Sequence, residues 1–306
     1  MRIVTYYKEY ILFLSRKAFL VIVVLLGLSL SACNKAAQFD GERAYEDVKY
    51  QVDLGPRTPG SAAHDQEVLW ITNRLEDLNW QVETQETVVS GQTVKNIIAK
   101  RGEGKPWVII GSHYDSRPVA DQDKNPANRK LPVPGANDGA SSTAILLELA
   151  RVIPVKIDKQ IWLVFFDAED SGLKSGSGWA TGSEYFVTQL TDQPDEAIIL
   201  DMVGDKNLDI YMEANSNDSL NQEIWGVAKE LGYTQFIPQY KYDLIDDHIP
   251  FINAGIRAAD VIDFDYPAWH TVGDTPEQVS AESLGVVGDT IFKWLQKYPQ
   301  SSAPYP

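Results

Sequence analysis

The chain has 306 residues, of which 44% are hydrophobic and 23% are charged, and its formal net charge is −16. This composition is typical of a soluble globular protein and excludes a repeat or low-complexity chain. The acidic balance excludes nucleic-acid binding through a patch that neutralises phosphates, so we expect no nucleic-acid partner.

The N-terminal segment has the pattern of an export signal. A basic stretch that ends at Lys17 precedes the apolar run Ala18–Leu30, which is too short to span a bilayer comfortably. The small residues Ser31 and Ala32 then precede Cys33, an arrangement that resembles the bacterial lipobox, whose cysteine is acylated. The alternative is an uncleaved membrane anchor in which the cysteine is incidental.

Three regions follow from this interpretation. Residues 1–33 are expected to be a lipoprotein signal peptide, 34–40 a tether, and 41–300 a single catalytic domain. The protein is then exported and attached to the membrane, on the periplasmic or cell-surface side, through lipidated Cys33. Because Cys33 is the only cysteine, the domain has no internal disulfide and must be stabilised by its own core. We expect a monomer.

Apolar periodicity predicts helices and strands along the whole domain. Helices are expected at Asp40–Val52, Ala62–Leu78, Ser141–Val152, Gly182–Leu190, Ser219–Leu231, His248–Ala254 and Ala281–Tyr298. Strands are expected at Val94–Ala99, Trp107–Ile110, Gln160–Phe166, Ala197–Val203, Leu208–Met212 and Ala259–Phe264.

Several of these strands are continuously apolar rather than alternating. The runs Trp107–Ile110, Ile161–Phe166 and Ala197–Leu200 have no polar face, and such strands are usually buried on both sides. The sequence therefore predicts an α/β fold, a three-layer α/β/α sandwich with a mixed, largely parallel central sheet. The long polar loop Arg117–Pro134 follows a strand end and is expected to lie over a ligand site.

Polar side chains follow the apolar strands at the points where they end. His113 follows the first run, Glu169 and Asp170 follow the second, Asp201 follows the third, and His270 follows the last strand. Ligands of open α/β sheets collect at the carboxyl ends of strands. Histidines and carboxylates without cysteine form a nitrogen and oxygen site, and zinc is the metal that suits it best.

Each of these residues also has an ordinary structural interpretation. A lone histidine is usually hydrogen-bonded in the core, and Asp138 and Asp247 each precede a predicted helix that they could cap. The combination of residues makes the metal site the better interpretation. Other chemistries lack their motifs, since the sequence has no G-x-S-x-G elbow, P-loop, dinucleotide glycine fingerprint or nucleophilic cysteine in the domain.

The order of these motifs resembles the zinc-dependent glutaminyl cyclases of the bacterial type, in the zinc aminopeptidase superfamily. The resemblance runs from about Ala44 to the C-terminus and implies a zinc exopeptidase-like fold. The motifs that carry it are Gly55-Pro-Arg57, Ser112-His-Tyr-Asp-Ser116, Gly135-Ala-Asn-Asp138, Phe166-Asp-Ala-Glu-Asp170, Leu200-Asp-Met-Val-Gly204, Asp246-Asp-His-Ile-Pro-Phe251 and Trp269-His270-Thr271.

Two metal arrangements are known within that superfamily. The cyclase resemblance implies one zinc ion, held by Asp138, Asp170 and His270. The aminopeptidase alternative implies two zinc ions, with His113 and Asp201 as additional ligands. The cyclases are favoured by Asp246, where aminopeptidases commonly have serine, and by Trp269 and Trp179, whose positions also resemble the cyclases. The pair Glu169-Asp170 departs from the Glu-Glu of animal cyclases and matches the bacterial group.

The resemblance also implies a reaction, the closure of N-terminal glutamine of a peptide or protein to pyroglutamate with loss of ammonia. Glu169 would be the general acid and base, Asp201 and Asp246 would hold the leaving amide, and Trp179 and Trp269 would line the substrate pocket. Trp179 has ordinary packing as its alternative. A close Asp201–Asp246 pair would share a proton and weaken the second metal site. The functional alternatives are a two-zinc aminopeptidase and a non-catalytic lipoprotein.

Overall fold

The computed structural model describes residues 37–171 and 179–298, and every helix and strand in them belongs to one compact unit that begins at Phe39. The predicted signal peptide with Cys33, and residues 34–36 of the predicted tether, lie outside the described residues. Within the described ranges, no helix combines the length and the apolar character that a membrane span requires.

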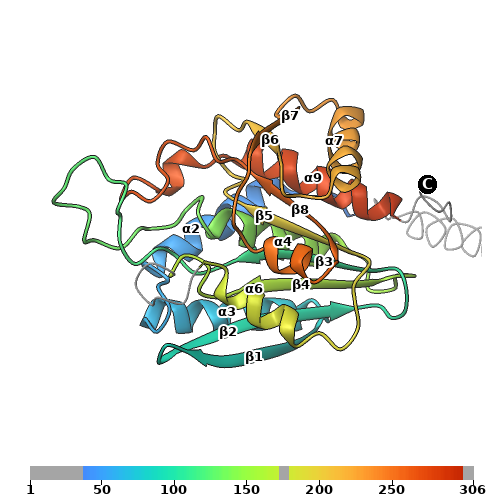
Figure 1. Ribbon diagram of the computed structural model, residues 1–306, viewed down its shortest axis with the longest axis horizontal. Helices are drawn as coiled ribbons and strands as arrows, with labels where there is room; N and C mark the ends of the chain where they lie inside the picture. The colour runs from blue at the N-terminus through green and yellow to red at the C-terminus, as the bar shows by residue number, and fades with distance from the viewer. Residues whose placement is uncertain (1–36, 172–178, 299–306) are drawn as a thin grey trace, which may run out of the picture. The chain divides into compact units, whose positions relative to one another are not determined.

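The elements alternate between helix and strand along most of the chain (Figure 1). The helices are α2 (Gly41–Asp53), α3 (Ala62–Asp77), α4 (Ala140–Val152), α6 (Thr181–Thr188), α7 (Asp218–Leu231), α8 (Ile249–Asn253), η1 (Pro276–Gln278) and α9 (Ala281–Lys297). The strands are β1 (Gln81–Val89), β2 (Gln92–Arg101), β3 (Trp107–His113), β4 (Gln160–Phe166), β5 (Glu196–Asp201), β6 (Ile210–Glu213), β7 (Phe236–Tyr242) and β8 (Arg257–Ile262).

Six strands form one mixed sheet in the order β1-β2-β4-β3-β5-β8. The pairs β1/β2 and β2/β4 are antiparallel, whereas β3 pairs in parallel with β4 and β5, and β5 pairs in parallel with β8. The register sets His113 opposite Phe166 and Asp201 opposite Ile262. The parallel strands therefore end together at one edge of the sheet.

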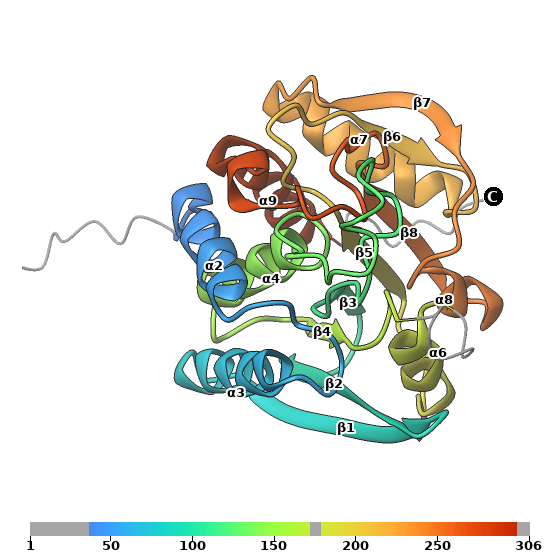
Figure 2. The same cartoon turned by 90° about the vertical axis from the view of Figure 1, so that its left-hand side faces the viewer.

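Helices cover both faces of this sheet, as Figure 2 shows, with α2, α3, α4 and α9 on one side and α6 and α8 on the other. Successive side chains of a central strand belong alternately to two separate hydrophobic cores, one on each face of the sheet. Leu163 and Phe165 of β4 belong to the larger one, and Val164 and Phe166 to the smaller one, which also contains Phe186 of α6. Burial on both faces explains why the central strands are continuously apolar. The predicted α/β/α sandwich is confirmed.

Four helices begin beside short polar side chains that accept backbone hydrogen bonds. Asp40 accepts from the N–H groups of Glu42 and Arg43 before α2, and Ser280 accepts from that of Ser283 before α9. Asn217 and Ser61 cap α7 and α3 in the same way. For these four helices the predicted start lies within one residue of the observed start.

Two strands, β1 and β7, were not predicted from the sequence. Both are polar and mostly exposed, with burial in β7 confined to its first residue, Phe236. Strand β1 forms a hairpin with β2 through Ser90 and Gly91, whose φ angles of 53° and 83° suit a tight two-residue turn. Strand β7 pairs with β6 in a separate two-stranded sheet. The strand predicted at Ala259–Phe264 is β8, shifted toward the N-terminus.

Candidate metal centre

The residues predicted to bind metal lie at the ends of the parallel strands or in the turns beyond them. His113 is the last residue of β3, and Asp201 is the last residue of β5. Asp170 lies in the turn after β4, Asp138 directly precedes the first turn of α4, and His270 lies between β8 and η1. The parallel pairing brings these turns to one edge, as expected for an open α/β sheet.

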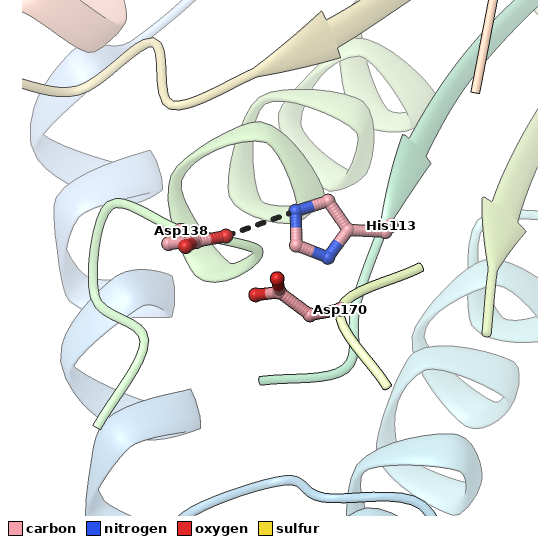
Figure 3. A group of neighbouring side chains, drawn as sticks. All are labelled: His113, Asp138 and Asp170. Atoms are coloured by element: carbon pink, nitrogen blue, oxygen red, sulfur yellow. Dashed lines mark ion pairs between the residues drawn. The ribbon is translucent and has the colours of Figure 1, made fainter. Parts of the chain in front are cut away.

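Three of these side chains point toward one another in Figure 3. His113, Asp138 and Asp170 are all buried, and one potential ligand atom from each lies within 4.8 Å of the other two. His113 Nε2 is 3.2 Å from Asp138 Oδ1. Buried histidine and carboxylate groups at this separation form a set of donors that suits zinc.

The structure places His270 and Asp201 against the same group. His270 Nε2 is 3.1 Å from Asp170 Oδ1 and 3.7 Å from Asp138 Oδ2. His113 Nε2 is 3.0 Å from Asp201 Oδ1. We call His270 and Asp170 the His270 side, and His113 and Asp201 the His113 side. Asp138 lies between them, so the ligand sets for one zinc and for two are both assembled.

The residues present fit a bound cation. Asp138 Oδ2 and Asp170 Oδ2 are buried, and neither makes a hydrogen bond with any residue in the described part of the chain. A buried carboxylate oxygen without a partner costs free energy. A divalent cation bound between the two aspartates would satisfy both oxygens, and two imidazoles stand beside them.

Charge is distributed unevenly between the two aspartates. Burial favours the neutral acid, yet His270, His113 and Arg117 lower the pKa of Asp170 to about 2. Burial and the negative charge of Asp170 raise the pKa of Asp138 well above its ordinary value. The basic groups around Asp170 therefore keep it ionised even without a bound metal. Asp138 needs a cation beside it to stay ionised.

Glu169 and Asp246, predicted to be catalytic, are both buried near these ligands. Burial, followed by the charges of Asp170 and Asp246, raises the pKa of Glu169 well above its ordinary value. Burial and the charge of Asp201 raise the pKa of Asp246 to about 6. Both groups can therefore hold a proton near neutral pH, as a general acid or a hydrogen-bond donor must.

The capping roles considered for Asp138 and Asp247 are wrong. Gly139 occupies the cap position of α4, and no side chain caps that helix. His248 occupies the cap position of α8, while Asp247 Oδ1 accepts a hydrogen bond from Ser183 Oγ at 2.5 Å. Neither aspartate side chain therefore caps the helix that follows it.

Two buried aspartates that sequence reasoning left without a role position these ligands. Asp115 accepts from the N–H groups of Glu169 at 3.1 Å and Asp170 at 3.3 Å, and it lies 3.5 Å from His113 Nδ1. Asp274 accepts from the N–H of Asp138 at 3.2 Å. Carboxylates that orient ligands are a regular part of zinc sites. For Asp115, the spacing His-x-Asp was the available signal.

Arg57, the last residue of the Gly55-Pro-Arg57 motif, has a structural role beside the site. Its guanidinium is fully buried, donates to the carbonyls of Pro134 at 2.5 Å and Gly135 at 2.6 Å, and lies 3.2 Å from Glu67. Gly135 has a φ of 71°, and a Cβ there would lie 2.7 Å from Arg57 Nη2. Arg57 thus holds the turn that leads to Asp138.

Left-handed backbone occurs at three non-glycine residues of the site. Ala168, Met202 and His270 have φ angles of 59°, 47° and 53°. Such conformations cost free energy and gather at functional sites, where the surrounding structure maintains them. Each one turns the chain sharply just beyond a strand or, at His270, within the turn that carries the imidazole.

The two predicted substrate-pocket tryptophans both lie against His270. The ring of Trp269 is 3.8 Å from the imidazole, centroid to centroid, at 25°, and that of Trp179 is 6.1 Å away at 15°. Arg117 lies over the Trp179 ring at 4.8 Å. Both indoles are half-buried, so each has a face that a ligand can reach.

The predicted loop contacts the site as expected. The N–H of Gln122 donates to the carbonyl of His270 at 3.2 Å, and Asp123 accepts from the N–H of Val272 at 3.2 Å. The loop is the green segment that extends at the left of Figure 1. Its first residues therefore hold the turn that carries His270.

Residues 96–295 match the model of peptidase family M28. Aminopeptidase YwaD of Bacillus subtilis (strain 168) is 28% identical over 84% of this chain, which spans only 57% of that protein. Glutaminyl-peptide cyclotransferase of Boiga irregularis is 27% identical over 81% of this chain and 77% of its own length.

Two solved structures are similar in both fold and sequence. Porphyromonas gingivalis glutaminyl cyclase is 32% identical, with a TM-score of 0.81, over 85% of this chain and 99% of that chain. A Zn-dependent exopeptidase from Parabacteroides distasonis ATCC 8503 is 30% identical, with a TM-score of 0.80, over 84% of this chain and 98% of that chain. The predicted zinc exopeptidase-like fold and the predicted resemblance are confirmed.

Proposed function

We propose that this chain, which belongs to peptidase family M28, is a zinc-dependent glutaminyl-peptide cyclotransferase that acts on peptide or protein N-termini. The observation that carries the proposal is the buried group of Asp138, Asp170 and His270, with Glu169 and Trp269 beside it. Similarity to glutaminyl cyclases over nearly the whole chain supports it.

In this proposal Asp138, Asp170 and His270 hold one zinc ion. Three protein ligands leave a coordination position open for substrate. When bound, zinc supplies Lewis-acid stabilisation of the charge that develops on the γ-carbonyl oxygen of glutamine. The arrangement of Asp138 and Asp170, whose Oδ2 atoms have no hydrogen-bond partner in the described ranges, supports these ligands.

The reaction itself takes place within the substrate. The α-amine nitrogen forms a bond to the γ-carbon, the bond from that carbon to the amide nitrogen breaks, and ammonia leaves. Glu169 takes a proton from the amine and returns it to the departing nitrogen. Its raised pKa and burial suit a group that must both accept and donate a proton near neutral pH.

The remaining residues orient the substrate. Asp201 and Asp246 form a carboxylate pair that would hold the leaving amide through hydrogen bonds, since the raised pKa of Asp246 allows it to donate as well as accept. Trp179 and Trp269 would bound the pocket for a single side chain beside His270.

The alternative function is a two-zinc aminopeptidase. It is favoured by the His113 side, where His113, Asp138 and Asp201 are assembled at 3.0 to 3.2 Å, and by the similarity to aminopeptidase YwaD. In that reaction Glu169 would take a proton from water rather than from the substrate amine.

Two peptides that are identical except for an initial Gln or Leu separate these functions. The cyclotransferase shortens neither peptide and makes the Gln peptide lighter by one ammonia, as mass spectrometry would show. Glu169→Gln provides the control for spontaneous cyclisation. Release of free Leu, with Gln closure no faster than in that variant, would refute the cyclotransferase and leave only the family.

We also propose that the protein is exported and anchored through a lipid on Cys33, and that 41–300 is its catalytic domain. The support is the apolar run followed by the lipobox-like Ser31-Ala32-Cys33. Cys33→Ala should abolish incorporation of labelled fatty acid and move the protein out of the membrane fraction. Retention of the label in that variant would rule out Cys33 as the attachment point.

A further inference from the structure

An arginine and an aspartate from the loop 117–134 lie directly behind the His270 side. Arg117 Nη1 donates to the Asp170 carbonyl at 3.0 Å and to Asp170 Oδ1 at 3.3 Å. Arg117 also donates twice to Asp121, from Nε to Oδ1 at 2.6 Å and from Nη2 to Oδ2 at 3.3 Å. One guanidinium therefore joins a proposed metal ligand to a second carboxylate.

That second carboxylate faces His270. The imidazole directs Nε2 toward Asp170 and Asp138, while its buried Nδ1 makes no hydrogen bond to any residue in 37–171 or 179–298. The Oδ1 atom of Asp121 lies 3.4 Å from this Nδ1. Because only one nitrogen of a neutral imidazole carries a proton, a carboxylate beside Nδ1 keeps the proton there and leaves Nε2 free to bind a metal.

We propose that Asp121 is a positioning residue that sets the tautomer and orientation of His270, and that Arg117 holds Asp121 and Asp170 in a common frame. The inference rests on the proposed zinc site, because it assigns these two residues to the support of its ligands. It gives the loop 117–134 a role in metal binding rather than only in covering the site.

The chemistry of both side chains suits this role. The Arg117 side chain is 1% exposed, and it pairs with Asp121 through two nitrogens while a third contacts Asp170, which the single nitrogen of a lysine cannot do. The Asp121 side chain is 30% exposed, so it has room to move closer to His270 Nδ1 when His270 binds a metal. Backbone hydrogen bonds from Gln122 and Val272 keep this part of the loop attached to the His270 turn.

Zinc affinity of the full-length protein tests the inference through competition with a chelator. Asp121→Ala should raise the zinc dissociation constant about 10–100-fold, the usual effect of removing a carboxylate that orients a ligand. Asp121→Asn, whose amide oxygen can still accept from Nδ1, should recover part of that loss. Asp192→Ala removes an equivalent exposed charge far along the chain and should bind zinc as the wild type does.

A second readout separates ligand positioning from folding. With Co²⁺ in place of zinc, Asp121→Ala should change the visible absorption of the ion, and the melting temperature of the metal-free protein should stay near that of the wild type. Wild-type affinity in Asp121→Ala, or a loss that only follows a lower melting temperature, would overturn the inference. A wild-type protein that binds no zinc would instead refute the proposed site.

Discussion

The two sides of the metal centre have the same kinds of ligand but opposite surroundings. On the His270 side, Arg117 is buried against Asp170 and supplies a permanent positive charge. On the His113 side, Asp201 and Asp246 are buried near each other, and neither pairs with a lysine or arginine among the residues that the structure describes. A permanent cation thus lies beside the carboxylates of the His270 side, whereas Asp201 is paired with the imidazole of His113.

This difference leads us to expect that the two sides differ in metal affinity. A pKa of about 2 keeps Asp170 ionised, as a ligand must be. On the other side, burial and the charge of Asp201 raise the pKa of Asp246 to about 6, so Asp246 can hold a proton. A protonated carboxyl group is a weaker metal ligand than a carboxylate, and it can donate a hydrogen bond. Under the proposed function, the His113 side would hold substrate and the His270 side would hold zinc.

The largest effect is expected at Glu169, which is influenced by one carboxylate from each side, Asp170 and Asp246. Glu169→Gln preserves shape but removes the proton acceptor, so the turnover rate should fall about 10²–10⁴-fold. Zinc content should remain that of the wild type, as measured by elemental analysis of the same preparation. Loss of the metal in this variant would place Glu169 among the ligands and remove the distinction between the two sides.

A smaller change is expected when the repulsion on the His113 side is relieved. Asp246→Ser removes the acidic neighbour of Asp201, so Asp201 should be able to bind a second ion with His113. Equilibrium metal analysis should then find more zinc per chain than in the wild type. Asp192→Ser, at an exposed position, is the matched control, and an unchanged zinc content in Asp246→Ser would contradict this explanation.

The smallest effect concerns the support of the Asp246 segment. Glu213 accepts hydrogen bonds from the N–H groups of Asn215 and Leu244, both at 2.9 Å, and lies 3.2 Å from His248 Nε2. Although burial opposes ionisation, His248 and these N–H groups lower the pKa of Glu213 to about 2.

Glu213→Gln should therefore lower the free energy of unfolding at neutral pH by about 1–3 kcal/mol. A depressed pKa stabilises the fold above the ordinary value near 4.5, and this contribution is lost as the pH falls toward 2. The variant should show less acid destabilisation in that window, while Glu103→Gln, which changes an exposed residue, should not. Denaturant unfolding at several pH values measures both, and identical pH dependence in Glu213→Gln and wild type would exclude this role.

Much of the fold was predictable because burial on both faces leaves a clear pattern. The central strands β3, β4 and β5 are continuously apolar, so they were found from sequence with boundaries shifted by a few residues. Strands β1 and β7 are polar and exposed, so only hydrogen bonding to a neighbour makes them strands. Local sequence carries little information about such pairing.

The same distinction holds for the site. His113 and Asp201 end apolar strands, so their positions alone predicted that they would meet. The functions of Asp274, Arg57 and Asp121 depend on backbone or side-chain partners far away in the sequence, such as the N–H of Asp138 for Asp274. No periodicity or short motif encodes contacts of that kind, and only the folded structure identifies them.

The number of tightly bound zinc ions tests the difference between the two sides most directly. The full-length wild-type protein is dialysed against metal-free buffer and measured by elemental analysis. It should retain about one zinc per chain, because Asp138, Asp170 and His270 provide the three protein ligands of one catalytic site. Asp170→Ala should lose that ion, and Asp201→Ala should keep it. Two tightly bound zinc ions in the wild type, or loss of the only ion in Asp201→Ala, would contradict the account.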